Sequence, residues 1–274
     1  MITRIAPTPS GYLHLGNAVN FQVVSWAAKR AAGSVALRID DMDAERYRPE
    51  FVDDIFAVLG WLGIEWHAGP IDRADFERHY SFRTRHEYFR AELDRLLALG
   101  PDAPVYACSC SRSALRAAGS RGCVSDCWQG GRALVPGQAA LRARVPVDAC
   151  VVVDGRPVAV AHAMGDVVLW RRDDHPAYHF ASVIQDRDLD VTDVIRGADL
   201  RDSTAVQRWL APFIGADNVA RATFRHHQLV TDEHGAKLSK SRLASGPLER
   251  TAPARAEVRR VARSIALDLG IEPD

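Results

Sequence analysis

A strand, a turn rich in glycine and proline, a helix and a second strand follow one another in residues 2–40. Residues 2–6 have the short apolar pattern of a strand, and residues 17–32 carry apolar side chains at helical spacing. A second strand-like run follows at 35–40, with Gly33 as the expected C-cap of the helix. Two strands joined by a crossover helix run parallel. The sequence therefore predicts an α/β fold built on a parallel sheet.

Composition indicates an ordinary globular protein and excludes several classes. Of the 274 residues, 47% are apolar and 26% are charged, and 35 Lys and Arg balance 35 Asp and Glu. A formal net charge of zero excludes a strongly basic nucleic-acid coat, although a local basic patch stays open. The sequence shows neither the run of about 20 apolar residues that spans a membrane nor the pattern of a secretory signal. We therefore expect a cytoplasmic protein.

The composition of the chain changes beyond residue 100. Residues 101–165 are rich in Gly, Pro and Cys, and we interpret them as an inserted subdomain. The predicted domains are thus 1–100 as the first half of the main domain, the insert 101–165, 166–241 as the second half of the main domain, and 242–274 as a helical tail. Further predicted elements are helices at 49–62, 76–99 and 254–269, a helix from Tyr178, and strands at 167–170, 191–196 and 223–230.

The turn at residues 7–16 carries the first chemical signal. It holds His14, and its glycines, Gly11 and Gly16, allow backbone to approach a ligand closely. N–H groups at a helix N-terminus attract anions, and a histidine there can donate to a phosphate oxygen. His14, Gly16 and Asn17 therefore predict a phosphate site, against the alternative of a plain surface turn. The fingerprint G-x-G-x-x-G is absent, which argues against a dinucleotide cofactor.

Two further groups of residues support a ligand site. Asp40, Asp41 and Asp43 follow the second strand, at the edge where open α/β sheets bind ligands. Near the end of the chain, the loop KLSKS contains Lys237 and Lys240. Alone, such a loop is a common solvated surface segment. Together with the turn at His14, it predicts that lysines reach the phosphates of ATP.

The turn and the lysine loop resemble the HIGH and KMSKS signatures of class I aminoacyl-tRNA synthetases. Residues 4–11, 37–43 and 191–204 resemble the glutamyl-tRNA synthetase family, and GADLRDST in the last segment is similar to its shorter branch, the glutamyl-Q-tRNA(Asp) synthetases. The resemblance implies a Rossmann-type catalytic domain that activates glutamate with ATP and Mg²⁺. Because the sequence ends at residue 274, we expect no anticodon-binding domain. The resemblance then implies a monomer that transfers glutamate to queuosine in the anticodon loop of tRNA(Asp).

The same resemblance implies roles for individual residues. Arg4, Tyr178 and Arg196 match the positions that hold the glutamate side chain, where a planar guanidinium pairs well with a carboxylate. Thr8 and Asp40 match the positions that hold the α-amino end. The residues matched to ATP binding and catalysis are His14, Gly16, Asn17, Lys237 and Lys240.

Three positions depart from the family pattern. Asp40 stands where the family usually has glutamate, Gln185 where it tends to have an acid, and Asn17 where the HIGH signature ends in histidine. A change of one methylene in a pocket alters discrimination by about 10–200-fold. An alternative is therefore a repurposed ligase that activates glutamate or a related amino acid for a small-molecule or peptide acceptor. A catalytically inactive RNA-binding paralogue is a third hypothesis, opposed by the intact His14, Lys237 and Lys240.

Four of the five cysteines lie close together in the sequence. The pattern is Cys108-x-Cys110 followed by Cys123-x-x-x-Cys127. In a reducing compartment such clustering favours a metal site over disulfides, and four thiolates suit tetrahedral Zn²⁺. We predict a structural zinc site that fixes the insert, against the alternative of a site that has lost its metal. Cys150 is interpreted as a buried thiol.

Overall fold

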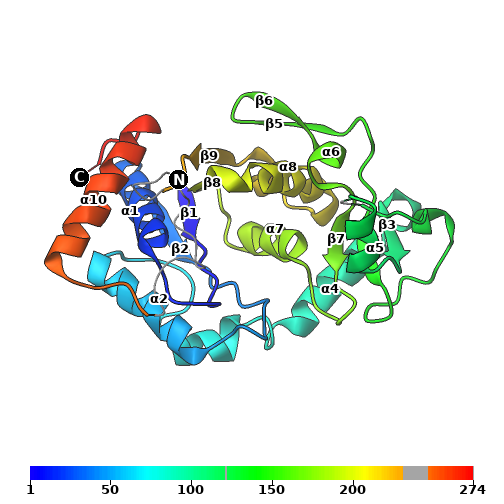
Figure 1. Ribbon diagram of the computed structural model, residues 1–274, viewed down its shortest axis with the longest axis horizontal. Coiled ribbons are helices and arrows are strands. Elements are labelled where there is room, and N and C mark those ends of the chain that lie inside the picture. The colour runs from blue at the N-terminus through cyan, green and yellow to red at the C-terminus, as the bar shows by residue number, and fades with distance from the viewer. Residues whose placement is uncertain (121, 231–245, 274) are drawn as a thin grey trace. The chain divides into compact units, whose positions relative to one another are not determined.

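The structure is a computed structural model that describes residues 1–120, 122–230 and 246–273 (Figure 1). Its internal contacts divide the chain into two compact units. The first unit comprises Met1–Arg85, Val191–Leu200 and Ala222–Asp274, and the second comprises His86–Asp190 and Arg201–Arg221. These units are defined by contacts, whereas the domain bounds 1–100, 101–165, 166–241 and 242–274 come from sequence patterns and stay a prediction.

The first unit is built on parallel strands, as expected. β1 (Ile2–Ile5) pairs in parallel with β2 (Ser34–Leu37), and β8 (Asp193–Gly197) pairs in parallel with β9 (Thr223–His227). The N–H of Thr192, next to β8, donates to the carbonyl of Ile2 at 2.9 Å, so β1 and β8 are neighbours. The spatial order is β2-β1-β8-β9. The order reverses between β1 and β8, which is where open α/β sheets bind ligands beyond the carboxyl ends of their strands.

Helix α1 (Leu15–Arg30) packs on β1, β2 and β8, and α10 (Ala252–Asp268) lies alongside it (Figure 1). Both predicted helices are confirmed, with slightly different ends. The prediction that Gly33 caps α1 is wrong, because Ala31 is the C-cap and Ala32 adopts the left-handed conformation at φ 46°. Gly33 has a different reason to lack a side chain: a Cβ there would lie 2.3 Å from the carbonyl oxygen of Met1.

The helix predicted at 49–62 is confirmed as α2 (Pro49–Leu62), which begins with proline at N1 and ends before left-handed Gly63. The single helix predicted at 76–99 is wrong, because the segment breaks after a π-helical turn, Phe76–Tyr80. The N–H of Phe82 and the hydroxyl of Ser81 both donate to the Asp41 carboxylate, at 2.9 and 2.6 Å. This long-range contact interrupts the helix. The short α3 (Arg73–Asp75) precedes the π-helix, and the 3₁₀ turn Ala198–Leu200 follows β8.

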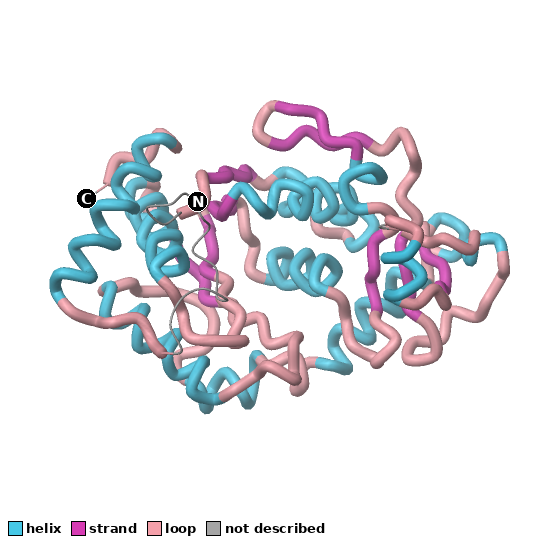
Figure 2. The backbone as a smooth tube through the Cα atoms, viewed as in Figure 1, coloured by secondary structure: helices cyan, strands magenta, loops and turns pink. Residues whose placement is uncertain are grey.

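The second unit contains a three-stranded antiparallel sheet, a separate hairpin and several helices (Figure 2). The sheet has the order β3 (Val105–Cys108), β4 (Ala140–Ala143), β7 (Val167–Trp170), and the hairpin is β5 (Cys150–Val153) with β6 (Arg156–Ala159). The helices are α4 (His86–Leu97), α5 (Arg112–Ala117), α6 (Val160–Met164), α7 (Tyr178–Asp188), α8 (Arg201–Leu210) and α9 (Asp217–Arg221), with 3₁₀ turns at Gly100–Asp102, Cys127–Gln129 and Ala211–Ile214.

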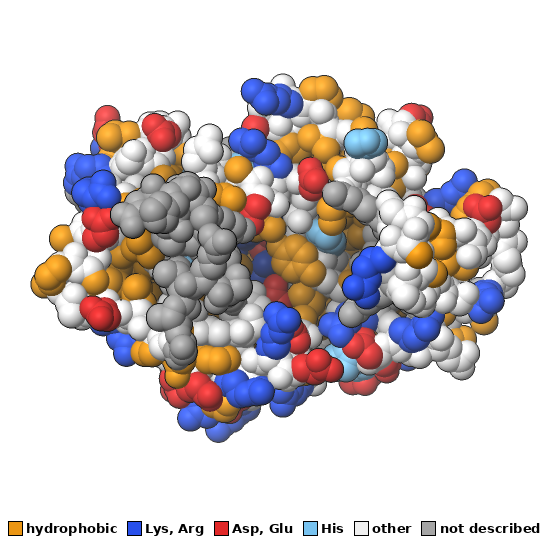
Figure 3. Space-filling model, in the orientation of Figure 1, with side chains coloured by type: hydrophobic (Ala, Val, Ile, Leu, Met, Phe, Trp, Pro, Cys, Tyr) orange, Lys and Arg blue, Asp and Glu red, His pale blue; other side chains and the backbone are white. Residues whose placement is uncertain are grey.

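The surface is mixed in charge. On the face shown in Figure 3, basic and acidic side chains are interspersed, in keeping with the formal net charge of zero. Within the described ranges, every helix is too short or too polar to cross a membrane.

Candidate active site and metal centre

The turn between β1 and α1 forms a capped helix N-terminus. His14 is the N-cap residue, and its ring Nδ1 accepts a hydrogen bond from the N–H of Gly16 at 3.1 Å. The Asn17 side-chain oxygen accepts from the N–H of His14, also at 3.1 Å. A neutral imidazole that accepts at Nδ1 carries its proton on Nε2. The turn therefore presents an imidazole N–H donor at the positive end of the α1 dipole, a combination that suits an anion.

Asp54, a buried carboxylate on α2, holds this turn in place through a hydrogen bond with its backbone. Its Oδ2 accepts from the N–H of Leu13 at 2.9 Å, and its Oδ1 pairs with the Arg250 guanidinium at 2.9 Å. Asp54 is 5% exposed. Sequence reasoning missed this residue, although an acid among the apolar positions of an amphipathic helix is a usable signal, because a buried charge needs a partner.

Four of the predicted amino-acid-binding residues lie at the carboxyl edge of the parallel sheet. Arg4 is on β1, Arg196 is on β8, and Thr8 and Asp40 follow β1 and β2. The N–H of Asp40 donates to the Pro7 carbonyl at 2.9 Å, which keeps the two loops side by side. Arg4, Asp40 and Arg196 are each no more than 5% exposed. Buried charges of both signs at a sheet edge are typical of a site for a charged ligand.

Arg196 is held against an aromatic ring. Its guanidinium carbon lies 5.2 Å from the centre of the Phe224 ring on the neighbouring strand β9. A second arginine of this strand pair, Arg225 on β9, instead pairs with Asp193 at 3.2 Å and is partly exposed. The two arginines therefore differ in burial and partner although both belong to the same strand pair.

The other two aspartates of the segment after β2 have local contacts. Asp41 accepts from Ser81 and Phe82, and burial raises the pKa of its carboxyl group despite these hydrogen bonds. Asp43 is half-buried and lies 3.5 Å from Arg46. The structure thus gives Asp41 an anchoring contact with Ser81 and Phe82, while Asp40 is a buried carboxylate beside the turn.

β9 ends in two buried histidines. His227 lies with Nε2 3.0 Å from the Asn20 side-chain oxygen on α1 and Nδ1 2.7 Å from the Gln228 carbonyl. Burial lowers the pKa of His227, so the ring is neutral at physiological pH. A neutral ring donates through one nitrogen only, so His227 donates either to the Asn20 oxygen on α1 or to the Gln228 carbonyl.

Other predicted site residues lie elsewhere in the chain. Tyr178 begins α7 and Gln185 lies within it, so both belong to the second unit. Gln185 is 4% exposed. Lys237 and Lys240 lie outside the described residues.

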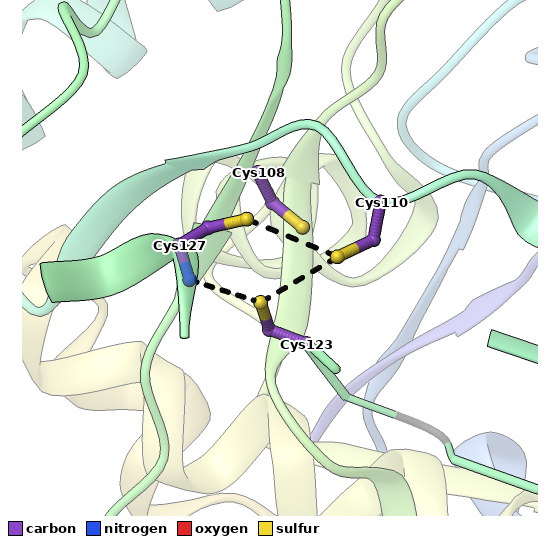
Figure 4. A group of neighbouring side chains, drawn as sticks. All are labelled: Cys108, Cys110, Cys123 and Cys127. Atoms are coloured by element: carbon purple, nitrogen blue, oxygen red, sulfur yellow. Dashed lines mark hydrogen bonds between the residues drawn. The ribbon is translucent and has the colours of Figure 1, made fainter. Parts of the chain in front are cut away.

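The four clustered cysteines of the second unit converge on one point (Figure 4). All their sulfur atoms lie within 4.8 Å of one another, with Cys110 3.7 Å from Cys123 and 3.8 Å from Cys127. Four sulfurs arranged tetrahedrally at about 2.3 Å from a zinc ion are about 3.8 Å apart. The spacing and the donor set therefore fit a tetrahedral metal site, and the predicted cluster can hold a metal.

The thiols of this cluster have different acidities. Burial raises the pKa of Cys108 to about 12. Burial also acts on Cys110, but hydrogen bonds from the Val124 backbone and the Ser125 side chain outweigh it and lower the pKa to about 6. At least one thiolate is thus available at neutral pH to begin metal binding. The prediction that Cys150 is buried is wrong, because it is exposed on β5.

Known proteins share this architecture. A family model described as "tRNA synthetases class I (E and Q), catalytic domain" matches residues 1–127 and 128–250. The protein named glutamyl-Q tRNA(Asp) synthetase in Nitratidesulfovibrio vulgaris is 34% identical, over 86% of this chain and 76% of its own length. The protein of the same name in Burkholderia cenocepacia is 38% identical, over 91% and 83%.

Among solved structures, the glutamate-tRNA synthetase of Elizabethkingia anophelis matches with a TM-score of 0.68 at 24% identity. The match covers 88% of this chain and 52% of that one, so this chain spans about half its length. At that identity the likeness shows the fold, and it confirms the predicted α/β class. The family match and the two relatives show that the chain belongs to the class I tRNA synthetase catalytic-domain family of the E and Q type, whose members are ligases.

Proposed function

We propose that this protein activates glutamate with ATP and transfers the glutamyl group to queuosine in tRNA(Asp). The observation that carries the proposal is the carboxyl edge of the parallel sheet. There a helix N-terminus with an imidazole donor at His14 accompanies the buried Arg4, Arg196 and Asp40. Donors for phosphates and opposite charges for an amino acid are the two requirements of adenylation.

In the first step the glutamate carboxylate attacks the α-phosphorus of ATP. An oxygen–phosphorus bond forms, the bond to the departing pyrophosphate breaks, and glutamyl-AMP results. His14 and the N-terminus of α1 would stabilise charge on the phosphates, with Lys237 and Lys240 acting from the lysine loop and Mg²⁺ accompanying ATP. No nucleophilic side chain is needed, because catalysis consists of positioning and charge stabilisation.

In the second step a hydroxyl oxygen of the acceptor attacks the activated carbonyl and AMP leaves. The names of the relatives from N. vulgaris and B. cenocepacia support queuosine of tRNA(Asp) as the acceptor. The test is incubation of the purified protein with labelled glutamate, ATP and either queuosine-containing or queuosine-free tRNA(Asp). Label in the queuosine-containing RNA alone supports the proposal, whereas its absence from both RNAs contradicts it.

A second candidate is transfer to a small amine, thiol or peptide. It is favoured by the neutral, buried Gln185 at a position where the family tends to have an acid, and by the shorter carboxylate of Asp40. Labelled low-molecular-weight products with unlabelled RNA would support this candidate over the first.

We further propose that the cysteine cluster holds Zn²⁺ in a structural role, since four thiolates and tetrahedral spacing suit this ion. The metal would link β3, which ends at Cys108, to the 3₁₀ turn Cys127–Gln129. A protein that uses ATP and tRNA would act in the cytoplasm, and we propose that it does so as a monomer.

The Asp40 position offers a test of amino-acid selection. We expect Asp40→Glu to lower the KM for glutamate by about 10-fold in ATP–pyrophosphate exchange, because the longer side chain reaches nearer to the ammonium group. The matched control is Asp43→Glu, a half-buried neighbour paired with Arg46, which is expected to leave KM unchanged. An unchanged KM for glutamate in Asp40→Glu, or an equal change in Asp43→Glu, would contradict the assignment of Asp40 to the ammonium group of glutamate.

Gly16 tests the phosphate turn. A Cβ at this position would lie 3.0 Å from Cε1 and 3.1 Å from Nδ1 of His14, so Gly16→Ala forces the imidazole to move. The ring must move by a few tenths of an ångström. Since a misplacement of about 1 Å can cost about 100-fold in rate, we expect this smaller shift to lower kcat for exchange by up to about 10-fold. Gly60→Ala, in α2 with open space around its Cβ, is the control and is expected to keep full activity. Equal rates in the two variants would exclude a role for the His14 geometry.

A further inference from the structure

A cavity lies beside the cysteine cluster in the second unit, and Cys110 of the cluster forms part of its wall. Its volume is about 460 Å³, and its walls come from the segment between β3 and α5, from α5, β4 and β7, and from the segment after β7. Three arginines line it, Arg142, Arg171 and Arg172, together with Ser111 and Asp173. None of these residues has a role in the proposed adenylation site.

Two of the arginines are fixed by neutral partners. Arg142 is 6% exposed, and its Nη1 donates to the Asp166 carbonyl at 2.8 Å. Arg172 Nη2 donates to the Ser109 carbonyl at 2.9 Å. A backbone carbonyl holds a guanidinium in place without cancelling its charge, so both side chains are oriented in advance of any ligand.

The third arginine is paired with an acid. Arg171 Nε donates to Asp173 Oδ1 at 3.0 Å. Two lining groups oppose the three arginines: Asp173, the one carboxylate among the described lining residues, and the thiolate that Cys110 would supply to the proposed zinc site. The walls therefore carry an excess of one positive charge. The Ser111 hydroxyl accepts a hydrogen bond from the N–H of Ala114 and so caps α5. Its own O–H can donate to a ligand in the cavity.

We propose that this cavity binds a phosphate of an RNA backbone. Guanidinium groups pair with phosphate oxygens in bidentate fashion, and a phosphodiester in RNA brings one negative charge, which balances the one excess positive charge of the walls. The volume exceeds that of a phosphate alone and leaves room for its attached sugar. The identity of the ligand as RNA rests on the proposed transfer to tRNA, whereas the preference for a phosphate rests on the arginines themselves.

The experiment measures binding of the full protein to unmodified tRNA(Asp) transcript by fluorescence anisotropy over a range of KCl concentrations. We expect Arg172→Ala to bind about tenfold more weakly and to lower the slope of log K against log salt by about one, the signature of one lost phosphate contact. Arg221→Ala, an arginine of α9 that is 76% exposed, is the matched control and is expected to change neither quantity. Arg171→Ala is a second variant, for use if Arg172→Ala has a reduced melting temperature.

Competition with inorganic phosphate separates the two sources of the ligand. Arg172-dependent phosphate binding with unchanged RNA affinity would overturn the RNA proposal in favour of a free anion. Wild-type RNA affinity and slope in both variants would overturn the site altogether. Glutamate-dependent ATP–pyrophosphate exchange, measured without RNA, reports on the proposed adenylation separately, so either idea can fail alone.

Discussion

Replacing Arg196 with alanine is expected to lower the kcat/KM for glutamate in ATP–pyrophosphate exchange by about 100- to 1,000-fold. Arg196 is 4% exposed at the carboxyl edge of the sheet, where its guanidinium would pair with the side-chain carboxylate of glutamate. Removing one partner of a buried charge pair costs about 3–4 kcal/mol, and each 1.4 kcal/mol is about tenfold. Arg196→Lys keeps the charge but loses the planar fork, so we expect an intermediate loss.

Arg225→Ala is the matched control for this prediction. It removes an arginine from the same pair of strands, but one that is paired with Asp193 and partly exposed. We expect its kcat/KM to stay within about twofold of the wild type, since exposed ion pairs contribute about 0–1 kcal/mol. Full activity in Arg196→Ala, or an equal loss in Arg225→Ala, would contradict the assignment of Arg196 to the glutamate pocket.

The second large effect is expected at the cysteine cluster. The purified protein should contain one zinc ion per chain, and Cys127→Ser should lose most of it and lower the melting temperature by roughly 5–10 °C. A structural zinc contributes about 10–16 kcal/mol of apparent binding free energy in small peptides, and loss of a metal site is among the most destabilising changes. Elemental analysis and thermal unfolding are the measurements.

Cys150→Ser provides the control for Cys127→Ser. Cys150 is exposed on β5 and is not part of the cluster, so its replacement should change neither the metal content nor the melting temperature. The metal should also dissociate as the pH falls, because thiolates bind the ion and protons compete for them. Retention of a full equivalent of zinc in Cys127→Ser would contradict a four-cysteine site.

Much of the fold was predictable where local signals determine it. Pro49 at the first position of α2 and left-handed Gly63 just after its end mark this helix, and both follow from backbone restrictions that the sequence displays. The break after Phe76–Tyr80 was not predictable, because it depends on Asp41, a carboxylate distant in the sequence that binds Ser81 and Phe82. The spacing of apolar residues that predicts a helix does not reveal a contact with a residue so distant in the sequence.

The residues of the candidate site also differ in whether local sequence signals could predict them. The helix start that holds His14, Gly16 and Asn17 was predictable, because a capped helix start after a strand is a local pattern, while the role of these residues in phosphate binding stays a prediction. Asp54 was missed, because its contacts with Leu13 and Arg250 come from segments that only the fold brings to α2. Gly33 was predicted to be a helix C-cap, whereas it is required because the backbone of Met1 lies close to it, and this tertiary contact is not visible in the local sequence. The exposure of Cys150 likewise depends on which face of the β5–β6 hairpin is covered.

The central claim is that the carboxyl edge of the parallel sheet activates glutamate. The most direct measurement is ATP–pyrophosphate exchange by the purified protein across a panel of amino acids, with and without tRNA. The account predicts that glutamate supports exchange, with a kcat/KM at least about 10-fold above those of glutamine and aspartate. A preference for any other amino acid, or no amino-acid-dependent exchange in either condition, would contradict it.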